Sequence, residues 1–174
     1  MAKVIISYDG SDNDADALAL GKLLADPTDL ALAYIRHTSE LDPEREKVAQ
    51  HDAERRLAQG AELLGRPDMP RHVVFGASTG AALEELADSE GASIVVFGSD
   101  YRTPPGHAEP PTSAQRLLEI GDTAVGVAAS GLRADPNASI SSIGVVSPDG
   151  DETAARTAEA LASSTGAQVV LDGA

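Results

Sequence analysis

Length, composition and charge restrict the classes of protein to which this chain can belong. Its 174 residues, 42% of them hydrophobic, allow one domain of ordinary size and a remainder. The net charge of -15 repels phosphodiester backbones and anionic lipid surfaces, so we expect binding to neither nucleic acid nor membrane. The lack of cysteine excludes disulfides and thiolate catalysis. We also expect no leader segment and no membrane span, and hence a cytoplasmic location.

Short apolar runs alternate with segments of helical spacing along most of the chain. The predicted strands are residues 3–7, 30–35, 73–75, 92–97 and 124–129. Helices are expected between them, beginning near Asp12, at Pro43 after the cap Asp42, at Ser78 or Thr79, and at Thr112, where Thr112 to Gln115 matches a capping box. This alternation predicts an α/β fold with a three-layer, doubly wound, five-stranded parallel sheet.

After a linker at residues 133–141, the chain repeats its own beginning in part. Pro148-Asp149-Gly150 parallels Tyr8-Asp9-Gly10, and each group follows a strand and precedes a helix. Chance similarity is the alternative, since the shared residues are few. The predicted division is a domain at residues 1–132, the linker, and an extra C-terminal βαβ unit at residues 142–174.

Three segments carry a resemblance to a known family. They are Asp9-Gly10-Ser11 after the first strand, Ile94 to Ser99, and Thr112 to Leu118 before a valine-bearing last strand. In these features residues 2–132 resemble the universal stress protein family. The resemblance implies a flavodoxin-like sheet of the adenine nucleotide alpha hydrolase type, with residues 142–174 as the opening of a truncated second domain. It also implies a role in stress response and dimerisation through the edge of the last strand.

ATP-binding members of that family carry a signature after the fourth strand: glycine, two residues, glycine, nine residues, and glycine followed by Ser or Thr. Such glycines let backbone N–H groups surround phosphates at a helix N-terminus. Here Gly98 is in place, but Tyr101 and Pro111 stand at the next two glycine positions, and only Thr112 keeps its type. Pro111 has no N–H to donate, Tyr101 is disfavoured in left-handed backbone, and Asp100 adds a carboxylate beside the phosphate path.

The sequence therefore predicts a non-catalytic stress-response protein that acts by binding and assembly and has a degenerate ATP-binding loop. No cofactor is the preferred expectation, and binding of ATP or another adenine nucleotide is the alternative. The residues that would contact such a nucleotide are Asp9, Ile35, Gly98, Ser99, Thr112 and Ser113. Asp9 could equally be only a turn residue and cap, and Ile35 only a core residue.

Strands pair at sheet edges, so partners are expected there as well. The last strand of the sheet would expose unpaired backbone groups, which a second copy or residues 143–146 of the same chain could satisfy. A homodimer is the prediction, and an unidentified protein partner is the further expectation.

A rival hypothesis is hydrolysis. Gly76-Ala77-Ser78-Thr79-Gly80 follows a strand and opens a helix, as the nucleophile elbow of a serine hydrolase does, and Asp100 and His107 follow in triad order. Too few strands precede the elbow, and Ser78 has a plain alternative role as a helix cap, so we expect no catalytic residue. The four histidines lack metal-ligand spacing, so no metal site is expected.

Overall fold

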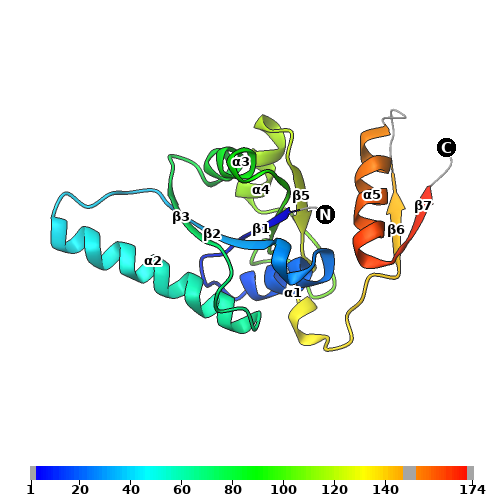
Figure 1. Cartoon of the computed structure of the whole chain (residues 1–174), viewed down its shortest axis with the longest axis horizontal. Coiled ribbons are helices and arrows are strands. Elements are labelled where there is room, and N and C mark those ends of the chain that lie inside the picture. Colours follow the sequence, from blue (N-terminus) through cyan, green and yellow to red (C-terminus); the bar gives the residue numbers. More distant parts are fainter. Residues whose placement is uncertain (1–2, 147–151, 172–174) are drawn as a thin grey trace.

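The computed structural model describes residues 3–146 and 152–171, and its largest feature is a parallel sheet. The strands are β1 (Lys3–Ser7), β2 (Leu30–Arg36), β3 (Arg71–Phe75), β4 (Ala92–Phe97) and β5 (Ala124–Val127). Their order is β3-β2-β1-β4-β5, so the chain moves outward from β1 to β3 and then crosses to the other side of β1 (Figure 1). This confirms the predicted doubly wound, five-stranded parallel sheet.

Helices cover both faces of this sheet. One layer contains α1 (Asp14–Leu24) and α2 (Pro43–Leu63), and the other contains α3 (Thr79–Glu90) and α4 (Thr112–Ile120). Successive side chains of a strand point to opposite faces. Accordingly Val4 and Ile6 pack in one cluster with Leu57 of α2, whereas Ile5 packs in the other with Leu83 of α3. Both clusters are mostly aliphatic, with Tyr8 in one and Phe97 in the other, and they lie on either side of the sheet with β1 buried at its centre.

The helix starts follow the predicted caps at α2 and α3 but not at α4. The Asp42 carboxylate accepts hydrogen bonds from two N–H groups in the first turn of α2, and the Ser78 hydroxyl does so from one in α3. At α4 the cap position is Pro111, and Thr112 is already helical. The predicted capping box is therefore wrong. Gln115 instead donates a side-chain hydrogen bond of 2.9 Å to a carbonyl of the preceding loop.

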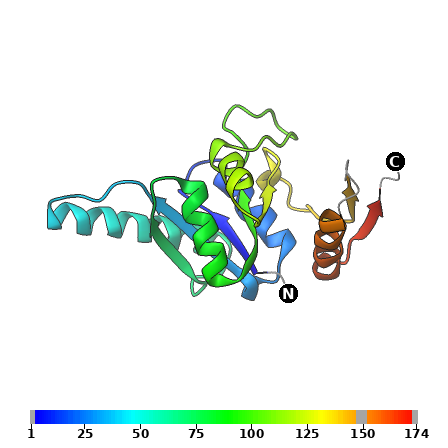
Figure 2. The ribbon, with the colours of Figure 1, turned by 90° about the horizontal axis from the view of Figure 1, so that it is seen from above.

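The C-terminal part of the chain forms a small unit of its own. β6 (Ser142–Val145), α5 (Glu152–Thr165) and β7 (Gln168–Leu171) make a two-stranded parallel sheet with one helix, at the opposite end of the molecule from the start of α2 (Figures 1 and 2). This matches the predicted extra βαβ unit. β6 pairs with β7, so the alternative in which residues 143–146 pair with β5 of the same chain is wrong. Asp149, the expected counterpart of Asp9, lies outside the described residues.

A buried carboxylate on α1 sets the direction of the chain after β5. Asp16 is 1% exposed and accepts hydrogen bonds from the N–H groups of Gly131 and Arg133, at 2.9 and 2.8 Å, and from the Arg133 guanidinium at 3.0 Å. These bonds hold the short 3-10 helix η2 (Leu132–Ala134) against α1. The predicted linker thus begins with a turn that is anchored to α1. The chain then reaches α5, whose Ser164 hydroxyl donates to the Leu24 carbonyl oxygen at the end of α1.

Two further observations complete the fold. A second 3-10 helix, η1 (Pro27–Asp29), precedes β2. Within residues 3–146 and 152–171, none of the helices combines the length and the apolar character that crossing a membrane requires.

Candidate functional site

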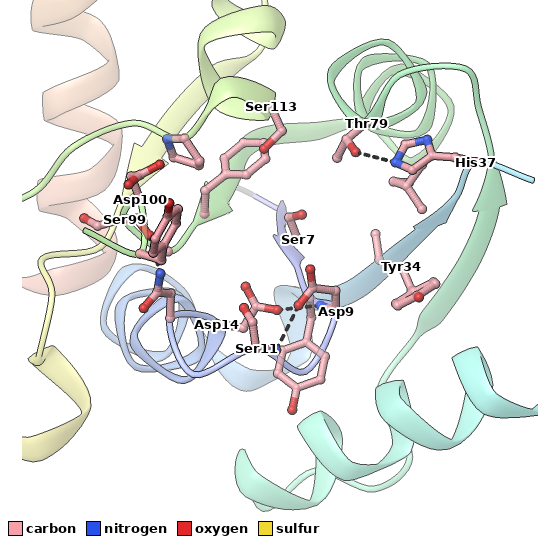
Figure 3. A pocket seen from close by; sticks show the side chains of 18 residues that line it. Ser7, Asp9, Ser11, Asp14, Tyr34, His37, Thr79, Ser99, Asp100 and Ser113 are labelled. Carbon is pink, nitrogen blue, oxygen red and sulfur yellow. Dashed lines mark hydrogen bonds between the residues drawn. The ribbon is translucent and has the colours of Figure 1, made fainter. Parts of the chain in front are cut away.

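A cavity of about 480 Å³ opens beyond the carboxyl ends of β1, β2 and β4 (Figure 3). Strand order reverses between β1 and β4, and doubly wound sheets bind their ligands at this place. The predicted nucleotide residues that line the cavity are Asp9, Ile35, Gly98, Ser99 and Ser113. Thr112, also predicted, is not among the lining residues, because it starts α4 and its side chain is exposed. The fold therefore brings most of the predicted site together.

The turn after β1 forms one side of the cavity, which we call the β1 wall (residues 7–14). The Asp9 carboxylate accepts a hydrogen bond of 2.8 Å from the Ser11 N–H, so Asp9 does act as a turn residue. Asp14, the first residue of α1, accepts hydrogen bonds from the N–H groups of Asp9 and Gly10 at 2.5 and 3.1 Å. Gly10 has φ +87°, a left-handed conformation that favours glycine. Figure 3 shows the Asp9 and Asp14 side chains beside each other at the cavity.

This arrangement changes the acidity of Asp14. Burial and the neighbouring charge of Asp9 disfavour its ionised form and raise the pKa of Asp14 to about 7, although the N–H donors of Asp9 and Gly10 oppose the shift. The β1 wall thus holds a carboxyl group that is partly protonated at neutral pH. Asp14 does not stand out in the sequence, because acids in a first helical turn are ordinary. Its spacing of five residues from Asp9 across a turn was the available signal.

The loop after β4 forms the opposite side, which we call the β4 wall (residues 98–111). Ser99 is 4% exposed, and its hydroxyl donates to the Ala128 carbonyl oxygen at 2.6 Å and accepts from the Glu109 N–H at 3.1 Å. The wall is also tied to the segment after β5, because the Gly106 N–H donates to the Ser130 carbonyl oxygen at 2.8 Å. Ser99 therefore lines the cavity with its hydroxyl already engaged in holding the loop.

Few backbone N–H groups of the β4 wall are left to bind a ligand. Four prolines in it carry no N–H, at 104, 105, 110 and 111. Six further residues donate their N–H groups to acceptors within the protein. They are Asp100, Arg102, Thr103, Gly106, His107 and Glu109. No non-glycine residue in the described ranges has positive φ, so the expected strain at Tyr101 is absent.

Gly98 is required for a reason of packing. A Cβ at this position would lie 2.3 Å from the Asn13 carbonyl oxygen at the start of α1. The Asn13 side chain also donates a hydrogen bond of 2.8 Å to the Ser99 carbonyl oxygen. The two walls thus touch through their backbones at Gly98. A glycine would be needed here whether or not phosphate binds.

The charges around the cavity are unfavourable for a polyphosphate. Its lining includes Asp9, Asp14 and Asp100, and neither lysine nor arginine is among the described residues that line it. Arg102 pairs with Asp100 at 3.6 Å and stacks on the exposed Tyr101 ring. Only the N-terminus of α4, which includes Ser113, offers helix N–H donors and a favourable dipole on this side.

The end of β2 supplies the third side of the cavity. His37 Nδ1 lies 2.9 Å from the Gly76 carbonyl oxygen, and its Nε2 lies 3.2 Å from the Thr79 hydroxyl (Figure 3). A carbonyl oxygen can only accept, so Nδ1 carries a hydrogen and donates it to Gly76. Ile35 lines the cavity and also packs against the core, so its core role is confirmed and its contact with a nucleotide stays a prediction. The sequence missed His37, although its place just beyond β2 was a signal.

The arrangement does not resemble a hydrolase site. Ser78, the expected nucleophile of that hypothesis, caps α3 by accepting from the Ala81 N–H at 3.2 Å, in ordinary extended backbone. Neither Ser78 nor His107 lines the cavity within the part of the chain that the structure describes. That part also contains no group of three or more His, Asp or Glu side chains placed to hold a metal ion.

Comparison with known proteins identifies the fold. No protein-family model and no curated protein matches the chain. A protein of the universal stress protein family from Burkholderia pseudomallei has a TM-score of 0.54 at 25% identity, covering 74% of this chain and 96% of that one. The universal stress protein from Archaeoglobus fulgidus in complex with dAMP has a TM-score of 0.53 at 11% identity, covering 74% and 98%. A universal stress protein in complex with cAMP has a TM-score of 0.52 at 20% identity, covering 74% and 96%. Over about three quarters of its length, this chain has the fold of the universal stress proteins.

Proposed function

We propose that the chain is a non-catalytic binding protein of the universal stress protein family, whose cavity holds an adenine nucleoside or its monophosphate and binds a triphosphate poorly. The cavity lies where this fold takes its ligands, at the reversal of strand order. Two proteins of the same fold were solved with dAMP and cAMP, each of which carries one phosphate. These similarities support the ligand class.

The proposal depends most on the small number of free backbone N–H groups in the β4 wall. A triphosphate needs several backbone N–H groups pointing at it, and most residues of this wall either are prolines, which lack an N–H, or have their N–H bound within the protein. Asp100 adds a carboxylate, and a carboxylate at about 4 Å from a phosphate repels it by roughly 1 to 4 kcal/mol, depending on screening. A ligand with one phosphate meets less of this repulsion than a ligand with three.

We also propose that the protein is not a catalyst, because the side chains that could act in catalysis are already hydrogen-bonded within the protein. Ser78 is used as a cap, both nitrogens of His37 are bonded, and the Ser99 hydroxyl joins two backbone groups. A nucleophile and its general base need to lie within hydrogen-bond reach of each other. The bonds of these side chains instead support a binding role.

Calorimetric titration with AMP, ADP and ATP at one salt concentration tests this function. We expect AMP to bind, and the affinity to fall with each added phosphate. Binding of ATP at micromolar Kd, as tight as that of AMP, would contradict the proposal. Incubation with ATP and with a generic ester substrate should give no turnover above that of the Ser78→Ala variant.

We also propose that the chain forms a homodimer through β5. This strand pairs with β4 along one edge, and its side chains are half-buried rather than exposed. An edge strand of this kind exposes backbone N–H and C=O groups that a second copy can pair. Light scattering should give the mass of a dimer, and a monomer at all concentrations tested would count against edge pairing.

A further inference from the structure

A second cavity, of about 360 Å³, adjoins the first on the side of α2. The two share Tyr34, Ile35 and His37 as lining residues, so they lie side by side. This second cavity lies away from the β4 wall, between the end of β2 and α2. The charged end of a ligand in the first cavity could therefore point either to the β4 wall or to the second cavity.

The second cavity is lined by arginines, which the described lining of the first cavity lacks. Arg36 and Arg56 line the second cavity. Arg36 is only 6% exposed and is bound to both carboxylate oxygens of Glu46, at 2.8 and 3.0 Å, so it is already neutralised. Arg56 is exposed, and its one hydrogen bond among residues 3–146 and 152–171 runs from Nη1 to the Asp9 carbonyl oxygen at 2.8 Å. Most of its five N–H donors are thus directed to no protein acceptor.

We infer that Arg56 forms an anion subsite, which takes the phosphate of a nucleoside monophosphate whose base and sugar occupy the first cavity. This inference rests on the proposed function. The bond to Asp9 holds the guanidinium at the boundary of the two cavities, beside Gly10 of the β1 wall. Planar guanidinium groups bind phosphate oxygens through paired N–H donors. The phosphate would then point away from the N-terminus of α4.

The acids of the second cavity do not cancel this subsite. Glu40 and Asp52 also line it, but Asp52 is paired with Arg55 at 3.1 Å. Because Arg36 and Asp52 are each paired, Arg56 and Glu40 remain as the opposite charges of the second cavity, whereas the first has three acids and no lysine or arginine in its described lining. An anionic group therefore gains by moving from the first cavity toward Arg56.

Titration of AMP and adenosine into the wild type and two variants tests the subsite. Arg56→Gln removes the charge, and Lys47→Gln is the control, because Lys47 lies on the same helix and pairs with Glu44, and neither residue lines either cavity. We expect Arg56→Gln to weaken AMP binding about tenfold and to leave adenosine binding unchanged. Lys47→Gln should change neither affinity, and Arg56→Lys should recover part of the loss for AMP.

The outcomes separate the subsite from the proposed function. If the wild type binds AMP and Arg56→Gln binds it equally well, the subsite is wrong and the proposed function stands. If Arg56→Gln weakens AMP and adenosine by the same factor, Arg56 only supports the β1 wall, and the subsite is also wrong. If the wild type binds neither ligand, the proposed function fails, and the subsite fails with it. An unchanged thermal midpoint shows that Arg56→Gln is folded.

Discussion

The β1 wall and the β4 wall face the same cavity but use their backbone groups differently. In the β1 wall, Asp14 gathers two N–H groups and Asp9 a third, so the wall presents carboxyl groups to the cavity. In the β4 wall, prolines and internal hydrogen bonds remove most N–H groups from the cavity. The cavity persists because strand order places it there, and not because a phosphate loop shapes it. The order of the strands thus sets where the cavity lies, whereas its two walls set which ligand charge it favours.

The contact between the two walls should be the most sensitive point. Gly98→Ala would place a Cβ 2.3 Å from the Asn13 carbonyl oxygen, so we expect a loss of about 3 kcal/mol in the free energy of unfolding. Gly144→Ala is the control, because a Cβ there would meet no atom within 4 Å. Urea unfolding measures both. Equal effects of the two substitutions would show that the walls do not touch as described.

The β1 wall should make stability depend on pH. The pKa of Asp14 is raised to about 7 from its ordinary value of 3.8, so the folded state disfavours the ionised form. Wild-type stability should therefore fall as pH rises from about 4 through 7. Asp14→Asn removes this loss and should stabilise the protein by about 2 kcal/mol more at pH 6 than at pH 4. Unfolding of both proteins at the two pH values tests it, and a gain independent of pH would refute the shift.

Within the β4 wall, the Ser99 hydroxyl should matter for stability. Ser99→Ala leaves the Glu109 N–H and the Ala128 carbonyl oxygen without this partner, so we expect a loss of about 1.5 kcal/mol. Ser93→Ala, on the exposed side of β4, should change stability by less than about 0.5 kcal/mol. Thermal unfolding compares them. If Ser99→Ala is as mild as the control, the loop is not held by this side chain.

The smallest expected effect is a partial restoration of the phosphate loop. Tyr101→Gly combined with Pro111→Gly returns two glycines and one N–H, and we expect ATP affinity to rise about fivefold. The Pro105→Gly variant changes a proline of the same wall outside the signature, and its ATP affinity should stay that of the wild type. Calorimetry measures both. An equal rise in the two variants would mean that loop stiffness, and not the lost donor positions, limits ATP binding.

The sequence predicted the features that depend on neighbouring residues. Alternating apolar runs gave the order of strands and helices, and Asp42 and Ser78 cap the helices that they were expected to cap. The cap of α4 was mispredicted because Pro111, with φ near -66°, takes the position assigned to Thr112. Local pattern therefore determined the framework.

The chemistry of the site depends on contacts between distant segments, which one sequence does not show. Ser99 was expected to contact a nucleotide, but its hydroxyl donates to Ala128, 29 residues away. Gly98 was attributed to phosphate binding, whereas the approach of Asn13 explains it. Arg56 lies on a long polar helix with nothing in its spacing to mark it, and only the fold brings it to Asp9.

A crystal structure grown with saturating ATP tests the central claim most directly. The account predicts that no ordered triphosphate lies over Ser113, because the β4 wall has few donors to offer it. A triphosphate held there by main-chain N–H groups of residues 98–113 would contradict the account.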